Sequence, residues 1–350
     1  MSLIAILGDT HFGLRNSLPV FYPHYTKFYN YFIDYLITNN ITTLIQLGDL
    51  FDSRKSINTQ SLKIAKEIFF NPLLENNIQL YTLIGNHDAH FKESILVNTP
   101  ELVLGEYSNV TIFSSPKTIS LYDITFDMIP WICKENEVEI LEFIQTSKSR
   151  FCCGHFEMSD FLMYKDIPVH AGIDKKTFEH YELVLSGHYH TYSQQDNIVY
   201  TGVPYEMTWQ DYNDQKGFYI YDTELNKLDF IKNPYNTFYK FDYDEDVELP
   251  NIEVDLENTF VKVNILKKTN NNLFEEFINS ITEKKCYDLK IHEPNVSVHT
   301  TADIEEFDIE DTISIIHTYI DNSNITVDKN IVKDFIKELY IEAVSLGDSK

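Results

Sequence analysis

Short runs of apolar residues recur along the first two-thirds of the chain, and most of them end abruptly in polar residues. The runs at residues 3–7, 44–47 and 80–84 have the length and the high hydrophobicity of buried strands in a parallel sheet, and residues 3–7 are continuously apolar. Between the first two, residues 25–39 place apolar side chains at positions 28, 31, 32, 35 and 36, on one face of a helix. Residues 59–70 also suit a helix. This alternation of strand and helix predicts an α/β fold.

The middle of the chain continues with further strand candidates. They lie near residues 110–113, 117–121, 124–129, 151–155 and 183–187, with a helix at 137–146. Residues 198–201 and 217–221 have the pattern of closing strands of a second sheet. We therefore expect two packed sheets flanked by helices.

The pattern changes after residue 232. Residues 233–236 are typical of a turn or linker, and residues 236–300 mix strand candidates (260–266, 287–291) with one helix candidate (273–282). Residues 301–322 and 327–346 are predicted to be helical. We expect a first domain over 1–232, a small α+β domain over 233–300 and a helical segment over 301–350. The last helix carries a broad apolar stripe, which includes Ile331, Phe335, Leu339 and Tyr340. This stripe could pack on its own domain or bind a partner helix or coiled coil.

Composition excludes some classes of protein. The net charge of −26 argues against a simple basic nucleic-acid-binding module, because phosphate contacts need Lys and Arg. It leaves open a metal enzyme that holds phosphate through bound cations. The four cysteines show neither zinc-ligand spacing nor a disulfide framework, which favours a reducing, cytoplasmic compartment. No apolar run approaches the ~18 residues of a membrane span, and the N-terminus lacks the basic start of a signal peptide.

Candidate chemistry gathers where the predicted strands end. Five short motifs follow five strands, and together they supply Asp9, His11, Asp49, Asn86, His87, His155, His188 and His190. Mixed oxygen and imidazole ligands suit Mn²⁺, Fe²⁺ or Zn²⁺. A carboxylate such as Asp49 can bridge two cations roughly 3.5–4 Å apart, and such a pair serves in-line phosphoryl displacement. Each motif alone is weak, and it is the set of five that predicts a site.

These motifs resemble those of the dinuclear, calcineurin-like metallophosphoesterase superfamily over roughly residues 1–222. The segments 48–52, 129–131 and 217–220, with the C-terminal additions, resemble SbcD-type DNA repair nuclease subunits, among them those of T-even-type phage recombination endonucleases. The resemblance implies a two-sheet α-β-β-α sandwich, a small α+β capping domain that contacts DNA, and C-terminal helices. It also implies that these helices dock on the coiled coil of an SMC-like ABC ATPase of the SbcC type. That favours partner binding for the apolar stripe.

The resemblance also implies roles for individual residues. One metal is expected on Asp9, His11, Asp49 and His190, and the second on Asp49, Asn86, His155 and His188, with Mn²⁺ as the expected ion. His87 would face the scissile phosphate, where it stabilises the transition state or protonates the leaving oxygen. Asp52 would orient His87 through a hydrogen bond or else cap its loop, and Asp88 would fix the turn or orient an imidazole. Arg54 and Lys55 would contact DNA phosphate or lie in a solvated loop.

The leading hypothesis is a Mn²⁺-dependent DNA exonuclease and endonuclease, the nuclease subunit of a repair and recombination complex. It would be a homodimer joined to two ATPase subunits, in the cytoplasm, or in the host cytoplasm if phage-encoded. One alternative is a stand-alone phosphodiesterase or phosphatase on a small substrate, which the acidic charge favours and the residues after 232 disfavour. Another is a non-catalytic scaffold, which predicts missing ligands, whereas all seven ligand positions are filled.

Overall fold

The structure is a computed structural model that describes residues 2–164, 167–168, 172–247 and 252–293, with the single positions 320, 329, 332, 333 and 336. The chain forms two compact units, residues 1–297 and 298–350. The five single positions are helical. The remainder of the two predicted C-terminal helices, with Ile331, Phe335, Leu339 and Tyr340, lies outside the described residues.

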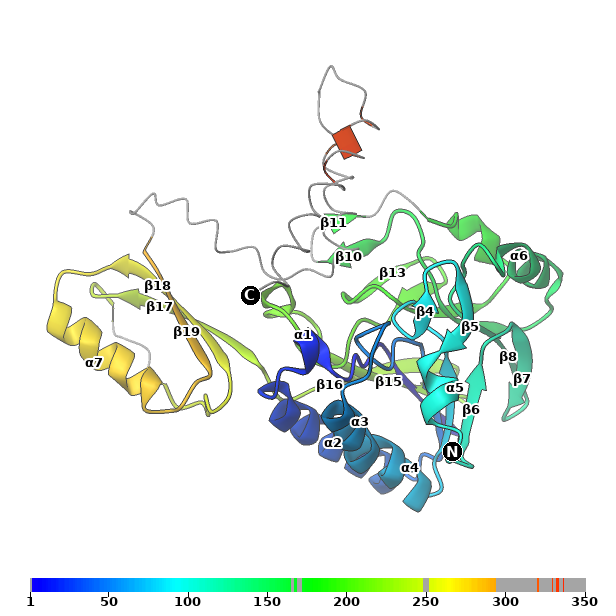
Figure 1. The fold of residues 1–350 in the computed structure, drawn as a ribbon, viewed down its shortest axis with the longest axis horizontal. Helices are drawn as coiled ribbons and strands as arrows, with labels where there is room; N and C mark the ends of the chain where they lie inside the picture. Colours follow the sequence, from blue (N-terminus) through cyan, green and yellow to red (C-terminus); the bar gives the residue numbers. More distant parts are fainter. Residues whose placement is uncertain are drawn as a thin grey trace. The chain divides into compact units, whose positions relative to one another are not determined.

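Two six-stranded sheets form the centre of the first unit, counted over the described residues (Figure 1). The first has the order β16 (Lys227–Lys232), β15 (Gly217–Asp222), β1 (Leu3–Leu7), β2 (Thr43–Gln46), β3 (Gln79–Leu83) and β6 (Val110–Phe113). The second has the order β13 (Ser193–Gln195), β14 (Ile198–Tyr200), β12 (Leu183–Gly187), β9 (Phe151–His155), β8 (Ile124–Ile129) and β7 (Lys117–Leu121). The four strands from β1 to β6 in the first sheet are parallel, as are the four from β14 to β8 in the second.

Successive side chains of a strand point to opposite faces of its sheet, and this alternation produces the layers. In β1, Ile4 and Ile6 belong to the core between the two sheets, whereas Ala5 and Leu7 belong to the core under helix α2 (Phe21–Thr38). On the second sheet, Asp127 of β8 accepts a hydrogen bond from Ser147, which ends helix α6 (Glu137–Thr146) on the sheet's outer face. The predicted two-sheet α-β-β-α sandwich is thus confirmed.

The helices on the first sheet begin or end differently from the prediction. Helix α2 begins four residues earlier than expected, and its aromatic side chains lie in the core. The predicted helix over 59–70 continues to residue 75, as α3 (Thr59–Ala65), a π-helical turn (Lys66–Phe70) and α4 (Asn71–Glu75). Pro72 does not end this helix; it lies in the first turn of α4, directly after the π-helical turn.

One strand was assigned to the wrong sheet. Residues 217–221 were expected to close the second sheet, but β15 pairs antiparallel with β1 in the first sheet. Its side chains are buried on both faces, so its apolar pattern carries no information about which sheet it joins. The other predicted closing strand, β14, does belong to the second sheet.

Short elements fill the connections. They are α1 (Leu14–Ser17), β4 (Ala89–Phe91), β5 (Ser94–Asn98), α5 (Thr99–Val103), β10 (Leu162–Tyr164), β11 (Ile167–Pro168) and two 3₁₀ turns (Lys175–Phe178, Trp209–Asp211). The segment labelled α1 is a left-handed turn, because φ is 50° at Arg15 and 54° at Asn16. Such a backbone is costly for residues other than glycine.

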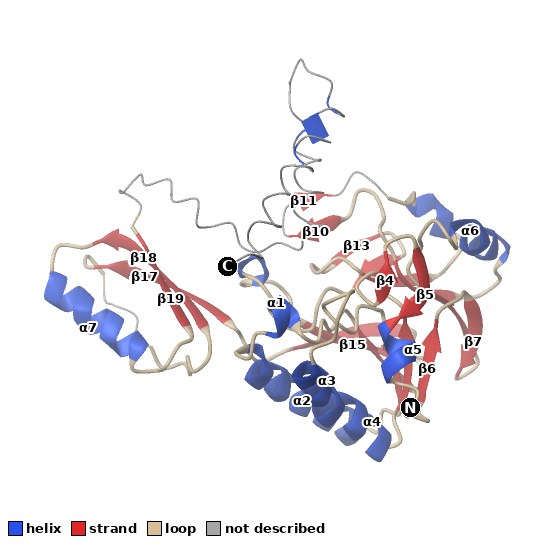
Figure 2. Cartoon of the chain, in the orientation of Figure 1, coloured by secondary structure: helices blue, strands red, loops and turns tan. Residues whose placement is uncertain are grey.

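The predicted small α+β segment is present. Strands β17 (Phe238–Asp244), β18 (Phe260–Lys267) and β19 (Asp288–His292) form a parallel three-stranded sheet, and helix α7 (Asn271–Thr282) covers one face (Figure 2). Val261 and Val263 pack against Phe274 and Phe277 of α7. Among the described helices, none has both the length and the hydrophobicity to cross a membrane.

Candidate metal centre

The five predicted motifs meet at the carboxyl ends of the parallel strands. Both sheets contribute, since β1, β2 and β3 lead to one set and β9 and β12 lead to the other. Within the described residues, three groups of side chains bring their ligand atoms within 4.8 Å of one another: Asp9, His11 and His190; Asp49, His155 and His188; and His11, Asp52 and His87. The first two groups correspond to the two predicted metal sites.

Donor atoms inside each group face one another closely. His11 Nε2 lies 3.1 Å from His190 Nε2. Asn86 Oδ1 lies 2.9 Å from His155 Nε2 and 3.0 Å from His188 Nδ1, so this amide oxygen joins the second group. Rotating the amide would instead direct its oxygen to Arg54 Nη2 at 3.1 Å. Asn86 therefore has one orientation that presents oxygen to a cation and another that presents it to arginine.

Asp49 lies between the two groups. Its Oδ2 is 3.8 Å from His11 Nε2 and 3.3 Å from His155 Nε2. The other carboxylate oxygen, Oδ1, accepts a hydrogen bond of 2.7 Å from the backbone N–H of His87. The main-chain carbonyl of Asp49 accepts a hydrogen bond from the N–H of His11 at 3.0 Å. Asp49 thus holds three of the loops together and is placed to bridge two cations.

The backbone is strained at three of the seven predicted ligands. The φ angle is 41° at His11, 53° at Asp49 and 86° at His188. Left-handed conformations at such residues cost of order 1–3 kcal/mol each and persist where the surroundings hold them. Here hydrogen bonds from backbone N–H groups to carboxylates hold the strained residues in place. The N–H of His188, for example, donates to Asp9 Oδ2 at 2.9 Å.

A glycine is required beside Asp49. A Cβ atom on Gly85 would lie 2.1 Å from Asp49 Oδ1 and 2.3 Å from the Asp49 nitrogen. Any larger residue would displace the bridging carboxylate.

Burial and charge fit bound cations. Asp9 and Asp49 are both 1% exposed, and Asp9 Oδ1 accepts no hydrogen bond. Burial, with the neighbouring Asp49 carboxylate, raises the pKa of Asp9 to about 7, although His155 opposes the shift. Burial lowers the pKa of His190 to about 3, which keeps its imidazole neutral, the form that binds metal. Two adjacent buried carboxylates and neutral imidazoles are a donor set that a divalent cation stabilises.

His87 lies beside this donor set and is fixed by Asp52. The ring Nδ1 of His87 donates to the main-chain carbonyl of Asp52 at 2.6 Å, which fixes the orientation of the imidazole. The Asp52 carboxylate approaches a different imidazole, since its Oδ1 is 3.3 Å from His11 Nδ1. The sequence left Asp52 either to orient His87 through a hydrogen bond or to cap its loop, and the structure shows a hydrogen bond to His87 that is made by the main chain of Asp52 and not by its carboxylate.

Other predicted neighbours take defined places. Asp88 accepts from the backbone N–H groups of Leu50 and Gly85, both at 3.0 Å, so the prediction that it fixes the turn is confirmed. Trp131 lies against the second group, with its ring centroid 5.1 Å from that of His188. Lys55 is exposed.

Three supporting residues were missed. Buried Gln46 accepts from the Gly48 N–H at 3.1 Å, Tyr25 donates to the carbonyl of His11 at 3.2 Å, and Lys216 donates to the carbonyl of His190 at 2.9 Å. Gln46 could have been noticed as the one polar residue in the apolar run 44–47. The other two carry no local signal, because their partners are distant in sequence.

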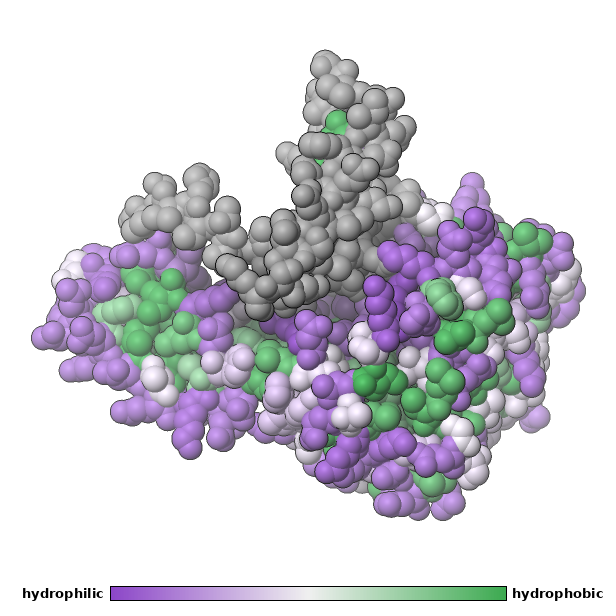
Figure 3. Space-filling model, in the orientation of Figure 1, coloured by the Kyte–Doolittle hydropathy of each residue, from purple (hydrophilic) through white to green (hydrophobic). Residues whose placement is uncertain are grey.

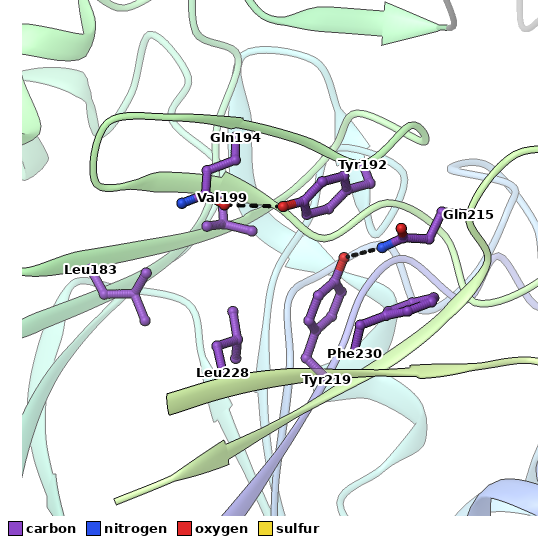
Figure 4. A pocket seen from close by; sticks show the side chains of 8 residues that line it. All are labelled: Leu183, Tyr192, Gln194, Val199, Gln215, Tyr219, Leu228 and Phe230. Carbon is purple, nitrogen blue, oxygen red and sulfur yellow. Dashed lines mark hydrogen bonds between the residues drawn. The ribbon is translucent and has the colours of Figure 1, made fainter. Parts of the chain in front are cut away.

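Two other histidines and a cavity do not belong to the three ligand groups. His24 is buried and bonds the carbonyl of Asn258 at 2.9 Å, while His90 is exposed. A cavity of about 390 Å³ opens beside β12–β16 and is lined by Tyr–Gln pairs and apolar side chains (Figure 4). Tyr192 donates to Gln194 at 3.0 Å there, and Gln215 to Tyr219 at 3.2 Å. None of the predicted site residues lines this cavity.

Comparison with known proteins gives a consistent result. The family model of the calcineurin-like phosphoesterases matches residues 2–192. Exonuclease subunit 1 of Enterobacteria phage T4 is 34% identical over 349 residues, which cover 96% of this chain and 98% of that protein. The DNA double-strand break repair protein Mre11 of Nanoarchaeum equitans (strain Kin4-M) is 29% identical over 268 residues, 66% of this chain and 70% of that protein. A solved archaeal phosphodiesterase covers 66% of this chain and 99% of its own at 15% identity, with a TM-score of 0.35, too distant to add to the family match.

Proposed function

Because the chain belongs to the calcineurin-like phosphoesterase family, we propose that it is a DNA nuclease that hydrolyses phosphodiester bonds with two divalent metal ions, Mn²⁺ being the ion used. The family is one of metal-dependent phosphoesterases. The observation that supports this activity best is the pair of donor groups that share Asp49, with His87 beside them. The two relatives named as an exonuclease subunit and a double-strand break repair protein support DNA as the substrate.

The proposed ligands divide between the two ions. Asp9, His11 and His190 would hold one ion, and Asn86, His155 and His188 the other, with Asp49 shared. When bound, such a pair activates water and stabilises both the attacking and the leaving oxygen of an in-line displacement.

The chain's own residues supply the remaining steps. His87, held through Nδ1, presents Nε2 to the phosphate and, when protonated, donates a hydrogen bond or a proton to the leaving oxygen. Asp52 positions His87 through its carbonyl and His11 through its carboxylate. In this proposal Asp52 is a positioning residue, because it acts through the imidazoles of His87 and His11.

The test compares substrates. The purified chain with Mn²⁺ is given end-labelled linear duplex DNA, single-stranded DNA and bis(p-nitrophenyl) phosphate. Release of nucleotides from DNA ends and cleavage within single strands are expected. Strong turnover of the chromogenic diester, with every DNA untouched, would favour the alternative of a small-substrate phosphodiesterase, for which the net charge of −26 is the supporting observation.

We also propose an assembly in the cytoplasm. The apolar stripe of the last predicted helix (Ile331, Phe335, Leu339 and Tyr340) would bind an SMC-like ABC ATPase of the SbcC type, as the family resemblance implies. Deleting residues 325–350 should abolish co-purification with that ATPase while metal content is unchanged. Retained complex formation would contradict this part of the proposal.

A homodimer is proposed from an exposed apolar surface. Phe91, Leu96, Val97 and Leu102 are 44–77% exposed on β4, β5 and α5, and Figure 3 shows hydrophobic side chains gathered over these elements. Exposed apolar side chains gathered on neighbouring elements suit a second copy of the chain. Replacing Leu96 and Leu102 with Glu should convert a dimer to a monomer in sedimentation velocity. An unchanged sedimentation coefficient would exclude this surface as the dimer interface.

A further inference from the structure

A cavity opens at one edge of the sandwich, between its two sheets. The strands β13 and β16 are the outermost strands of their sheets on this side. The cavity is lined by Leu183 and Val199 from the second sheet and by Tyr219 and Leu228 from the first (Figure 4). All four belong to the core between the sheets or pack against it. We call this space the edge cavity, and it is the place where that core is left unfilled.

The edge cavity has an apolar floor and a polar, uncharged rim. Val199 and Tyr219 are 3% and 4% exposed, whereas the side chains of Gln194 and Gln215 are exposed. Among the described residues that line the cavity, none carries a charged side chain. Burying an unpaired phosphate or carboxylate is costly, so the edge cavity does not suit an anionic group. It suits a neutral ligand.

Three aromatic rings line the edge cavity. The ring centroids of Tyr192 and Tyr219 are 6.1 Å apart, and the two rings are inclined at 22°. The ring of Phe230 lies 5.2 Å from that of Tyr219, inclined at 53°. Aromatic rings pair favourably with further rings at centroid distances of about 4.5–7 Å. The lining therefore favours a flat ring over an aliphatic chain.

Tyrosine hydroxyls orient the two glutamines of the rim. Gln194 Oε1 accepts a hydrogen bond from the Tyr192 hydroxyl at 3.0 Å, and Gln215 Nε2 donates to the Tyr219 hydroxyl at 3.2 Å. Within the described part of the chain, the other amide atom of each glutamine side chain has no hydrogen-bond partner. The rim thus offers a ligand one donor, Gln194 Nε2, and one acceptor, Gln215 Oε1.

A nucleobase has the properties that this lining requires. Its ring stacks on aromatic side chains, and its edge carries donors beside acceptors. Adenine, for example, presents the N7 acceptor next to the N6 amino donor, which complement Gln194 Nε2 and Gln215 Oε1. The volume of about 390 Å³ lies within the range of small-molecule sites, roughly 300–1,000 Å³. An apolar side chain of a partner protein could fill the same space, but it would leave both amide groups unpaired.

The edge cavity is distinct from the metal centre but adjoins the same backbone. Within the described residues, no member of the three ligand groups lines it. Tyr192 follows His190 by two residues, and Gln215 directly precedes Lys216, whose Nζ donates to the His190 carbonyl at 2.9 Å. The edge cavity is therefore a second site, on the chain segments that support His190.

We propose that the edge cavity binds the base of a nucleoside or nucleotide, with its ring against the three aromatic side chains and its polar edge bonded to Gln194 and Gln215. The sugar and any phosphate point to solvent, because nothing charged among the described residues lines the cavity. This site goes beyond the proposed nuclease function and does not depend on it, because it uses none of the proposed metal ligands.

The test is the binding of deoxyadenosine to the full chain in chelating buffer, measured by isothermal titration calorimetry and saturation-transfer NMR. Saturable binding is expected. Deoxyadenosine 5′-monophosphate should bind with the same affinity, because its phosphate makes no contact, and 2-deoxyribose 5-phosphate, which lacks the base, should not bind. Q194A/Q215A removes two hydrogen bonds, each with an effect of about fivefold, and should weaken binding about 25-fold.

Two further variants control for surface changes and locate the site. Q60A/Q145A removes two exposed glutamines elsewhere and should keep the wild-type affinity. L228W places a larger side chain in the edge cavity and should abolish binding, with all variants checked for equal unfolding temperatures.

The proposal fails on any of four results. They are no saturable binding of deoxyadenosine, the wild-type affinity in Q194A/Q215A or in L228W, an equal loss in Q60A/Q145A, and binding of both phosphorylated compounds without binding of deoxyadenosine. These results are distinct from failure of the proposed function, in which the wild type binds deoxyadenosine but cleaves no DNA.

Discussion

The metal centre and the edge cavity are both built by the two sheets together, but they use different parts of them. The metal centre is built at the strand ends, by residues in loops such as 8–11, 48–52 and 85–88. The edge cavity is built between the sheets, largely by side chains of β12 to β16. The first arrangement requires glycine and strained backbone, and the second requires only that the side chains leave space between two sheet edges.

That difference determines what each region tolerates. At the strand ends, backbone N–H groups bond carboxylates at 2.7–3.0 Å, and a change at one residue moves several others. At the edge cavity, the exposed side chains of Gln194 and Gln215 each make one hydrogen bond within the described residues, to a neighbouring tyrosine. We therefore expect large and coupled effects at the metal centre and small, additive effects at the edge cavity.

The largest effect is expected at His87. Replacing His87 with Ala should lower kcat on DNA by about 10²–10⁴-fold, the usual contribution of a general acid, while both metals stay bound. Metal content by mass spectrometry and cleavage of end-labelled DNA test this together. His90→Ala is a matched control, because His90 is exposed, lies three residues away and is not in any of the three ligand groups. Loss of metal, or unchanged cleavage, would show that the role assigned to His87 is wrong.

A buried ion pair behind the metal centre should give the next largest effect. Lys216 and Asp211 are 4% and 2% exposed and lie 2.7 Å apart. Lys216→Met leaves Asp211 buried without its partner and should lower the free energy of unfolding by about 3–5 kcal/mol in urea. Lys227→Met removes an exposed pair with Asp229 and should cost under about 1 kcal/mol. Equal effects of the two substitutions would contradict the importance of burial here.

The same pair predicts a pH dependence. Burial alone would raise the pKa of Asp211, but the Lys216 ammonium holds it below its ordinary value, so the stabilisation is present above about pH 4 and is lost as the pH falls through the lowered pKa. Burial alone would lower the pKa of Lys216, but Asp211 and Asp214 hold it above its ordinary value. Its stabilisation is present below about pH 10 and is lost as the pH rises through the raised pKa. The difference in unfolding free energy between wild type and Lys216→Met should therefore be greatest between these limits and shrink outside them.

Gly85 tests how closely the strand ends are packed. A Cβ at this position would displace the Asp49 carboxylate, and a shift of about 1 Å at such a site lowers kcat roughly 10²-fold. Gly85→Ala should show this loss together with weaker metal binding. Gly105→Ala is the control, because nothing lies within 4 Å of its added Cβ. Wild-type activity in Gly85→Ala would mean that the loop can yield without moving Asp49.

The two regions also differ in how far the sequence predicts them. Asp9 and Asp49 each follow an apolar run after one glycine, and His155 ends such a run, so their place at one edge of a sheet follows from the parallel arrangement. The sheet that residues 217–221 join could not be predicted from the sequence. The side chains of β15 are buried on both faces, and the same apolar pattern would suit a strand of either sheet. Pairing partners depend on tertiary packing, which a local pattern does not record.

The edge cavity was missed for a related reason. In sequence, Gln194 and Gln215 lie in two separate polar segments, and Tyr219 lies in an ordinary apolar strand. Nothing in any one segment distinguishes these side chains from others on the surface or in the core. Only the packing of the two sheets, which brings Gln194, Gln215 and Tyr219 to one place, identifies them.

The smallest predicted effect has the opposite sign from the others. If the edge cavity is an unfilled part of the core, a longer side chain on its floor should stabilise the protein. Val199→Ile adds one methylene group beside this space, and its burial should raise the free energy of unfolding in urea by up to about 0.8 kcal/mol. Val184→Ile is the control, since Val184 is fully buried and does not line the cavity. There the added methylene meets packed atoms, so the free energy of unfolding should fall. A loss of stability in both variants would mean that the floor of the edge cavity is as tightly packed as the rest of the core, which leaves no room there for the ring of a ligand.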